Sequence, residues 1–312
     1  MKNKKLSVIY ILLAGALWGS SCLFVGKLTD MGFSPLQCTT IRMVVAALIL
    51  NVALVVKGVK NYRISAASLG LCALSGICSV LAMCIFYYYS MTSTSATVSA
   101  ILLYTAPVFV MIMSVIFFKE KMTGKKIAAF AVAIVGCALV SGIATGAAAD
   151  AKGIVFGVLS GLAYSLYGIF TTFYMRRNTE RLTFSALNFA FAAMGALMLS
   201  NPAEIVRITA RTDNIPLTVG FFLLFGLCTA ALPYVFYTAG LSGVRPDVAS
   251  ILAFSEPLTA ALFGITVLGQ PFDVTQGIGI ALVTAAIVML NISFGKRKNK
   301  KDKKNKIDIN VT

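Results

Sequence analysis

Two charged residues, Glu256 and Arg42, lie inside long apolar segments, unlike the other charged residues of the chain. The chain has eleven acidic residues; ten lie in polar stretches, whereas Glu256 lies near the middle of an apolar segment. If that segment spans a membrane, a charged acid there costs roughly 2.5–3.5 kcal/mol, so it should face a cavity, hold a partner or stay protonated. Glu256 is therefore a candidate site for a proton or for the amine of a bound solute.

Arg42 is the second such ion, about two turns into its own apolar segment. Three roles fit a guanidinium in this place. It can hold a substrate carboxylate bidentately, pair with Glu256 across the interior, or extend outward to the polar surface. Structural pairing is slightly favoured over ligand binding by the sequence.

Prolines interrupt two apolar segments at matching positions. Pro257 follows Glu256, and Pro107 lies mid-segment behind Tyr104 and Thr105. Proline removes one helix hydrogen bond and leaves carbonyls for water, a side chain or a substrate to reach. Interrupted helices at matching depth point to a central transport site, and Tyr104 is a candidate there, but a packing kink explains the prolines alone equally well.

Aromatic residues supply further candidates. Trp18 lies well inside the first apolar segment, and Tyr164 matches it 146 residues later; with Tyr167, they fit cavity lining and simple packing equally. Tyr87, Tyr88 and Tyr237 lie toward the ends of their segments. They fit a pair of gates, although an aromatic belt at the membrane surfaces is the favoured interpretation.

Several chemistries are excluded or weakly supported. The chain has no histidine, which removes histidine catalysis and histidine metal ligation. Its seven cysteines lie in apolar stretches without C-x-x-C spacing, so neither a disulfide framework nor a metal site is expected. No phosphate-binding G-x-x-x-x-G-K-[ST] segment is present. We expect no enzyme activity, no cofactor and no metal.

The elements that must position these residues are membrane helices. Of the 312 residues, 58% are apolar and only 12% charged, too few charges to coat a soluble domain. A membrane helix needs about 20 apolar residues. The sequence predicts an all-α integral membrane protein with ten such spans: 7–26, 35–56, 68–90, 94–118, 124–143, 153–174, 183–200, 217–239, 247–268 and 273–294. The longest connection, 201–216, is expected to form a surface helix or turn.

Basic residues predict the orientation. Of the 27 Lys and Arg residues, 22 fall on one side of the ten spans and four on the other, and cytoplasmic loops hold the excess. We therefore expect a multi-pass protein of the cell membrane with both termini in the cytoplasm. The basic segment 295–312 is expected to be a disordered tail attracted to anionic lipid headgroups rather than to nucleic acid.

The chain repeats itself. A shift of 150 residues places Phe86-Tyr87 on Phe236-Tyr237 and Pro107 on Pro257. The two units, 7–144 and 151–294, each hold five spans, and an odd number inverts the second unit relative to the first. The sequence thus predicts two inverted five-helix repeats around a central cavity. The spacing of Gly15 and Gly19, and of Gly153, Gly157 and Gly161, predicts close helix approach in both units.

These motifs make the chain resemble the EamA-type family of the drug/metabolite transporter superfamily from about residue 6 to 294. The resemblance is carried by Leu17-Trp18-Gly19-Ser20-Ser21, Gly32-Phe33-Ser34-Pro35 with Arg42, Lys119-Glu120-Lys121 after Pro107, and Glu256-Pro257 with Leu268-Gly269-Gln270. It implies two inverted five-helix halves around a central cavity and export of amino acids or other small metabolites by alternating access. Gln270 departs from the pattern, because the family often has an acid there that matches Glu120.

The expected function is therefore a secondary transporter that exports amino acids or related small organic solutes through a midplane site. Glu256 is the candidate for proton coupling. A passive channel and an intramembrane enzyme acting on lipid-linked substrates are the alternatives. The sequence leaves open the substrate, the direction, the coupling ion, the oligomeric state and whether Arg42 pairs with Glu256 or with substrate.

Overall fold

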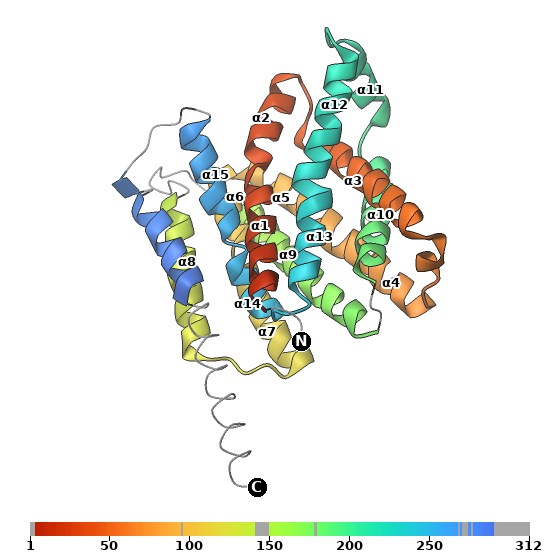
Figure 1. The fold of residues 1–312 in the computed structure, drawn as a ribbon. Coiled ribbons are helices and arrows are strands. Elements are labelled where there is room, and N and C mark those ends of the chain that lie inside the picture. Colours follow the sequence, from red (N-terminus) through yellow and green to blue (C-terminus); the bar gives the residue numbers. More distant parts are fainter. Residues whose placement is uncertain are drawn as a thin grey trace, which may run out of the picture.

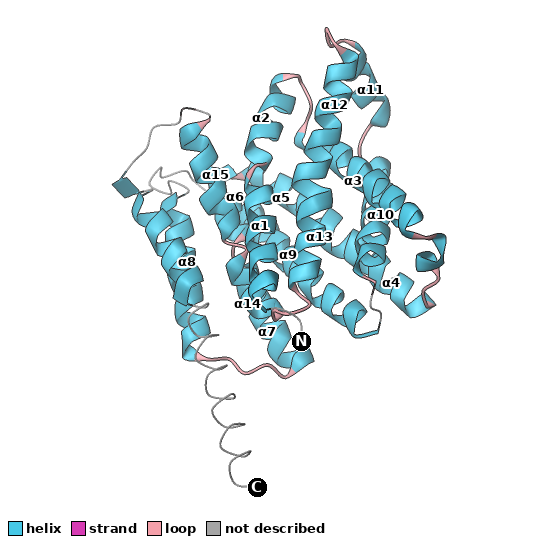
Figure 2. Ribbon diagram, in the orientation of Figure 1, coloured by secondary structure: helices cyan, strands magenta, loops and turns pink. Residues whose placement is uncertain are grey.

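The apolar segments fold into long helices. The computed structural model describes residues 4–94, 96–140, 150–177, 180–267, 269, 274–275 and 277–289. Figure 2 shows helices joined by short loops, and the described residues contain no strand. In chain order the elements are α1 (Lys4–Gly19), α2 (Ser21–Asp30), α3 (Pro35–Lys57), η1 (Val59–Tyr62), α4 (Ala66–Leu74), η2 (Ser75–Leu81), α5 (Ala82–Ser93), α6 (Ala96–Leu103), α7 (Ala106–Phe118), α8 (Gly124–Val140), α9 (Ala151–Arg177), α10 (Arg181–Leu199), α11 (Pro202–Ala210), α12 (Ile215–Gly226), η3 (Leu227–Ala231), α13 (Leu232–Gly240), α14 (Pro246–Leu252), α15 (Ser255–Thr266) and a helix at Gly277–Met289.

Eight helical stretches are long and apolar enough to cross a membrane. Two shorter helices, α8 with 17 residues and Gly277–Met289, lie where the fifth and tenth spans are expected, so the count of ten stays a prediction. The eight are Lys4–Asp30, Pro35–Lys57, Ala66–Ser93, Val98–Phe118, Ala151–Arg177, Arg181–Leu199, Ile215–Gly240 and Pro246–Thr266.

Local capping explains where several of these helices begin. Ser34 accepts a hydrogen bond from the Gln37 backbone N–H while the Gln37 side chain accepts one from the Ser34 N–H, a capping box that starts α3. Asn201 and Asn214 cap α11 and α12 by a single bond each: their side-chain oxygens accept from the backbone N–H of Glu204 and Leu217, and proline lies in the first turn of each helix. The connection at 201–216 therefore contains a surface helix, α11, as predicted.

Three of the spans are interrupted. The first breaks at Ser20, where the Ser20 and Ser21 hydroxyls donate to carbonyls three residues earlier. The other two break at 104–105 and 253–254, immediately before the half-helices that carry Pro107 and Pro257 near their start. Because proline has no N–H for the carbonyl four residues back, each break is a consequence of the local sequence.

Two other spans contain a π-helical turn. These turns are η2 in the third span and η3 in the seventh of the eight, and a shift of 150 residues superimposes much of one on the other. Such turns change the direction of a helix and recur at functional sites. The proline-associated breaks and the π-helical turns thus occupy equivalent positions in the two halves of the chain, whereas the break at Ser20 has no counterpart in the continuous helix α9.

The two halves of the chain pack into each other. The first span of each half lies against two broken or bent spans of the other: α1 packs on α13 and α15, and α9 packs on α5, α6 and α7. Helices α3 and α10 pack on each other, one from each half (Figure 1). The center of the molecule is therefore built from both halves.

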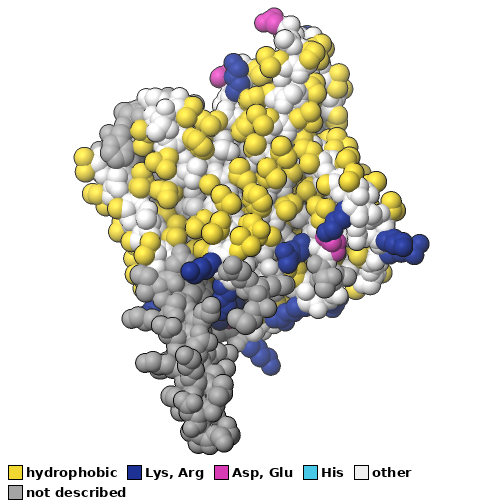
Figure 3. Space-filling model, in the orientation of Figure 1, with side chains coloured by type: hydrophobic (Ala, Val, Ile, Leu, Met, Phe, Trp, Pro, Cys, Tyr) yellow, Lys and Arg dark blue, Asp and Glu magenta, His cyan; other side chains and the backbone are white. Residues whose placement is uncertain are grey.

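The outer surface is apolar around its middle. Figure 3 shows hydrophobic side chains over the central part of the molecule, while Lys and Arg gather toward the end where Figure 1 places the N-terminus. Large apolar residues face outward, as Val56 (83% exposed) and Met198 (81%) illustrate. A lipid-facing belt explains this surface. We call the end with Lys57, Lys126, Arg177 and Arg245 the basic end.

Candidate functional site

Two small adjoining cavities lie in the center of the molecule, each with a volume of about 10 Å³, room for one water molecule. The side chain of Tyr164 lines both. The first, the aromatic cavity, is lined by Trp18, Ser79, Val80, Met83, Tyr164, Tyr167, Tyr234 and Tyr237. The second, the acid cavity, is lined by Leu103, Tyr104, Ala106, Pro107, Tyr164, Ser250, Ala253, Phe254 and Glu256.

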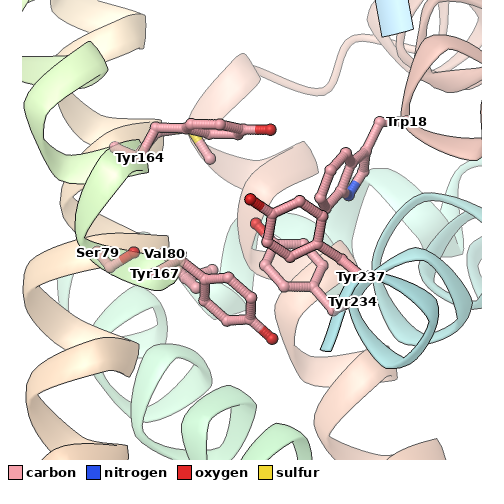
Figure 4. Close-up of a pocket in the computed structure, with 8 residues that line it drawn as sticks. Trp18, Ser79, Val80, Tyr164, Tyr167, Tyr234 and Tyr237 are labelled. Atoms are coloured by element: carbon pink, nitrogen blue, oxygen red, sulfur yellow. The ribbon is translucent and has the colours of Figure 1, made fainter. Parts of the chain in front are cut away.

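Trp18 is the hub of the aromatic cavity. It lies just before the break between α1 and α2, and its ring centroid is 6.1 Å from that of Tyr164, 5.1 Å from Tyr234 and 5.5 Å from Tyr237. Figure 4 shows these rings gathered around one space, with Tyr167 below Tyr164. The helix break allows Trp18 to reach rings from two helices of the second half of the chain.

Tyr167 closes the cavity on another side. Its ring lies edge-on to Tyr234 at 4.8 Å, and its hydroxyl is 2.8 Å from the Thr238 hydroxyl. The sequence places Tyr234 in the same aromatic cluster as Tyr237, which fits either a gate or an aromatic belt, but it gives no indication of Ser79. Tyr234 precedes Tyr237 by three residues and therefore shares its helix face. Ser79 lies in the π-helical turn η2, which the sequence pattern did not reveal.

Glu256 lies in the first turn of α15, directly after the helix break. Its half-buried side chain lines the acid cavity beside Tyr104 and Pro107. Within the described residues its carboxylate makes no ion pair, and it interacts electrostatically with Arg42, Tyr87, Tyr104, Cys137, Tyr164 and Tyr234. The carboxylate is thus available to a ligand in the cavity.

Arg42 approaches the site from α3. Its Nη2 donates to the Cys84 sulfur at 3.0 Å, and it interacts electrostatically with Tyr234 and Glu256. No ion pair within 4.0 Å joins Arg42 to Glu256 in the described part of the chain. The one hydrogen bond that the structure gives the guanidinium, to Cys84, uses one of its five N–H donors.

The predicted gate residues fall into two groups. Tyr237 is buried and lines the aromatic cavity, whereas Tyr87 is half-buried and is not among the residues that line either cavity. Tyr88 instead packs on Tyr89, with ring centroids 5.6 Å apart. Their role as gates stays a prediction.

The small residues predicted to allow close helix approach do so. A Cβ on Gly15 would lie 2.0 Å from the Ser255 hydroxyl oxygen, and one on Gly19 would lie 2.5 Å from the Glu256 carbonyl oxygen. In the other half, a Cβ on Gly161 would lie 2.8 Å from the Thr105 hydroxyl oxygen. Each first span is thus pressed against the helix break of the opposite half.

The described residues contain no cluster of three Cys, Asp or Glu side chains with the spacing of a metal site. Organic groups with an amine, a carboxylate or an apolar body are the ligands that Glu256, Arg42 and the aromatic rings can hold.

Comparison with known proteins identifies the family. The model of the EamA-like transporter family matches the chain twice, over residues 5–142 and 151–292. The chain belongs to the EamA-like transporter family. The resemblance inferred from the motifs is therefore confirmed, and the protein is a multi-pass membrane transporter.

Similar EamA-like chains occur in bacteria and archaea. An uncharacterized transporter of Clostridium kluyveri is 25% identical over 309 residues, covering 95% of this chain and 96% of its own. One of Archaeoglobus fulgidus is 29% identical over 204 residues, covering 65% and 70%. YwfM of Bacillus subtilis, also an uncharacterized transporter, is 22% identical and covers 93% and 95%.

A solved structure shows the same fold. It superimposes with a TM-score of 0.75 and covers 93% of this chain and 98% of its own, at 14% sequence identity. At this identity the likeness concerns the arrangement of the helices alone.

Proposed function

We propose that this EamA-like chain is a secondary carrier for small organic solutes that bear both an amine and a carboxylate, such as amino acids. The observation that carries this proposal is the placement of Arg42 and Glu256. They have opposite charges and form no ion pair within 4.0 Å of each other among the described residues. Arg42 interacts electrostatically with Tyr234, which lines the aromatic cavity, while Glu256 lines the acid cavity, and Tyr164 lines both cavities.

A zwitterion complements this arrangement. Its carboxylate receives two parallel hydrogen bonds from the planar guanidinium of Arg42, and its ammonium pairs with Glu256. An apolar side chain then fills the aromatic cavity and excludes water from both ion pairs. The cavities have room for about one water each, so binding requires Trp18 and the tyrosines to move apart.

The carrier works by alternating access in this proposal. Ten helices form two inverted five-helix repeats, and rocking of the repeats exposes the same site to one side and then to the other. The packing of each first span on the other half supports this, because the close contacts at Gly15 and Gly161 leave smooth faces for small displacements. Protonation of Glu256 couples the movement to a proton gradient, and export is the proposed direction.

The experiment is binding and counterflow of three related probes: leucine, its decarboxylated amine and its deaminated acid. In the purified protein, leucine should raise the melting temperature more than either probe, because only leucine engages both charges. In proteoliposomes preloaded with leucine, external labelled leucine should accumulate transiently, as a carrier requires and a channel does not allow. Equal shifts for all three probes would contradict recognition of a zwitterion. Absence of counterflow for every solute that shifts the melting temperature would contradict the carrier.

A further inference from the structure

Ion pairs connect the two repeats at the basic end of the molecule. Lys57 after the second span binds Glu180 at the start of α10, with 2.6 Å between Nζ and Oε2. Lys126 of α8 binds Asp247 of α14, and Arg245 binds Glu120 in the connection between α7 and α8. All three pairs join a residue of the first repeat to one of the second.

The pair of Lys126 and Asp247 is the most buried of these. Only 6% and 3% of their side chains are exposed. Lys126 also donates to the Lys121 carbonyl at 3.1 Å, and Asp247 also accepts from the Val248 N–H at 2.8 Å. Buried charges held by further hydrogen bonds form a fixed contact, and removing one partner alone leaves an uncompensated charge.

Asp247 is also connected mechanically to the candidate site. It lies in the first turn of α14, a seven-residue helix whose side chains are all buried, and the break at the far end of α14 leads directly to Glu256. Figure 1 shows α14 at the basic end beside α7 and close to α8. A movement of α14 at the site therefore displaces Asp247 from Lys126.

The positions related to these residues by the sequence repeat carry no such charges. A shift of 150 residues relates Glu120 to Gln270 and Lys126 to Gln276, and it relates Arg245 to Ser95 and Asp247 to Thr97. All four equivalents are uncharged. The sequence therefore supplies the four charges of this network in one set of repeat-related positions and not in the other.

The third ion pair, between Lys57 and Glu180, has charged residues at its repeat-related positions, but these do not form an ion pair with each other. Lys57 and Glu180 correspond to Arg207 and Asp30, but Arg207 binds Glu204 of its own helix at 2.7 Å. No ion pair links Asp30 to Arg207 among the described residues. In this structure every ion pair between the repeats that the described residues form lies at the basic end.

We propose that Lys126, Asp247, Arg245 and Glu120 form a one-sided latch that holds the basic end closed and must open for the site to reach that side. This inference rests on the proposed alternating access. Because the four positions related to the latch by the 150-residue shift are uncharged in the sequence, the two closed states differ in stability, and the latch favors the state that is shut at the basic end. Neutralising the latch shifts the population toward the state that is open there.

The test uses Cys84 beside Arg42 as a reporter of access. In a chain whose other six cysteines are replaced, a membrane-impermeant maleimide is added to either side of membrane vesicles. The variant Lys126→Met with Asp247→Asn removes both charges and leaves no unpaired buried ion. We expect at least about fivefold faster labelling from the basic-end side, and no increase from the other side. The matched control is Lys125→Gln, because the neighboring Lys125 is exposed and forms no ion pair in the structure; its labelling rate should equal that of the parent.

Equal labelling of the double variant and the parent would overturn the latch, as would the same acceleration in Lys125→Gln. Where the double variant fails to melt cooperatively, Glu120→Gln replaces it, since this pair is partly exposed at the rim; an unchanged rate there overturns the latch too. Leucine counterflow in the same vesicles separates the two proposals. If the parent shows no leucine counterflow, the carrier proposal is overturned. If the parent shows counterflow but the double variant is labelled at the same rate as the parent, only the latch proposal is overturned.

Discussion

Tyr104 and Phe254 occupy equivalent positions 150 residues apart, and their rings contact each other with centroids 5.6 Å apart. Each lies at the break of its own helix, so the two interrupted helices meet at their breaks. The equivalent pair two residues further along differs in charge: Glu256 corresponds to Ala106, which is 1% exposed. The two proline-associated breaks are therefore alike in backbone, but only the break in the second repeat carries a carboxylate at this position.

Glu256→Gln is expected to abolish solute accumulation driven by a pH gradient. The amide keeps the size and polarity of the side chain but cannot take up a proton, so folding and the melting temperature should change little. The measurement is uptake into proteoliposomes with and without an imposed pH gradient. Glu204→Gln, which removes a carboxylate from the surface helix α11, is the control and should behave as the parent. Unchanged flux at every pH would remove Glu256 from the coupling role.

Arg42→Lys is expected to weaken binding of solutes with a carboxylate and to spare their decarboxylated amines. Lysine keeps the charge but loses the planar pair of donors. The loss should be roughly 10- to 100-fold, because a hydrogen bond to a charged group contributes about 1.5–3 kcal/mol. Competition binding with leucine and its amine measures the difference. A proportional loss for both ligands would mean that Arg42 acts on the structure of the cavity and not on the carboxylate.

Gly15→Ala is expected to destabilise the protein by about 1–3 kcal/mol, the usual cost of forcing an extra methyl group into a packed contact. The added carbon would lie 2.0 Å from the Ser255 hydroxyl oxygen and 3.1 Å from the backbone at Ala253 and Glu256. Gly26→Ala is the control, because nothing lies within 4 Å of a Cβ there. Thermal melting compares the two. A melting temperature for Gly15→Ala at or above that of Gly26→Ala would show that α1 is not pressed against the break.

Much of this architecture follows from sequence because the membrane makes strict demands. Apolar length gives the spans, and the prolines at 107 and 257 mark the breaks, since a backbone without water must lose a hydrogen bond where proline occurs. The ion pairs between repeats did not follow from the sequence, because Lys126 and Asp247 are 121 residues apart and each lies at the start of a predicted span, where charges are common. That Arg42 and Glu256 form no ion pair among the described residues also required the structure, since the sequence left open whether Arg42 pairs with Glu256 or with a substrate.

For the aromatic cavity too, the sequence predicted some of the lining residues and the structure was needed to bring the others to the same place. Helical spacing places Tyr164 and Tyr167 on one face of α9, but only the break after Trp18 and the crossing of α1 with α13 bring Tyr234 and Tyr237 to the same space. Proximity to a predicted surface made Tyr237 look like a belt residue. Tertiary packing instead buries it to 4% exposure.

The ion pair between Lys57 and Glu180 predicts that the stability of the folded protein depends on pH. Partial burial raises the pKa of Glu180, but hydrogen bonds from Lys57 and from the Leu182 N–H, with the charge of Lys57, outweigh it and hold the pKa below its usual value of 4.5. A carboxylate with a lowered pKa stabilises the folded state above the pKa of the unfolded chain, and this contribution is lost as the pH falls through the folded value.

Glu180→Gln should therefore lower the melting temperature at neutral pH by an amount worth less than about 1 kcal/mol, since the pair is partly exposed. The amide still caps α10, so the cap is not lost with the charge. The difference from the parent should shrink once the pH drops below 4.5, as measured by melting across an acidic pH series. A difference that stays constant or grows with acidity would mean that the ion pair with Lys57 does not stabilise this end of the protein.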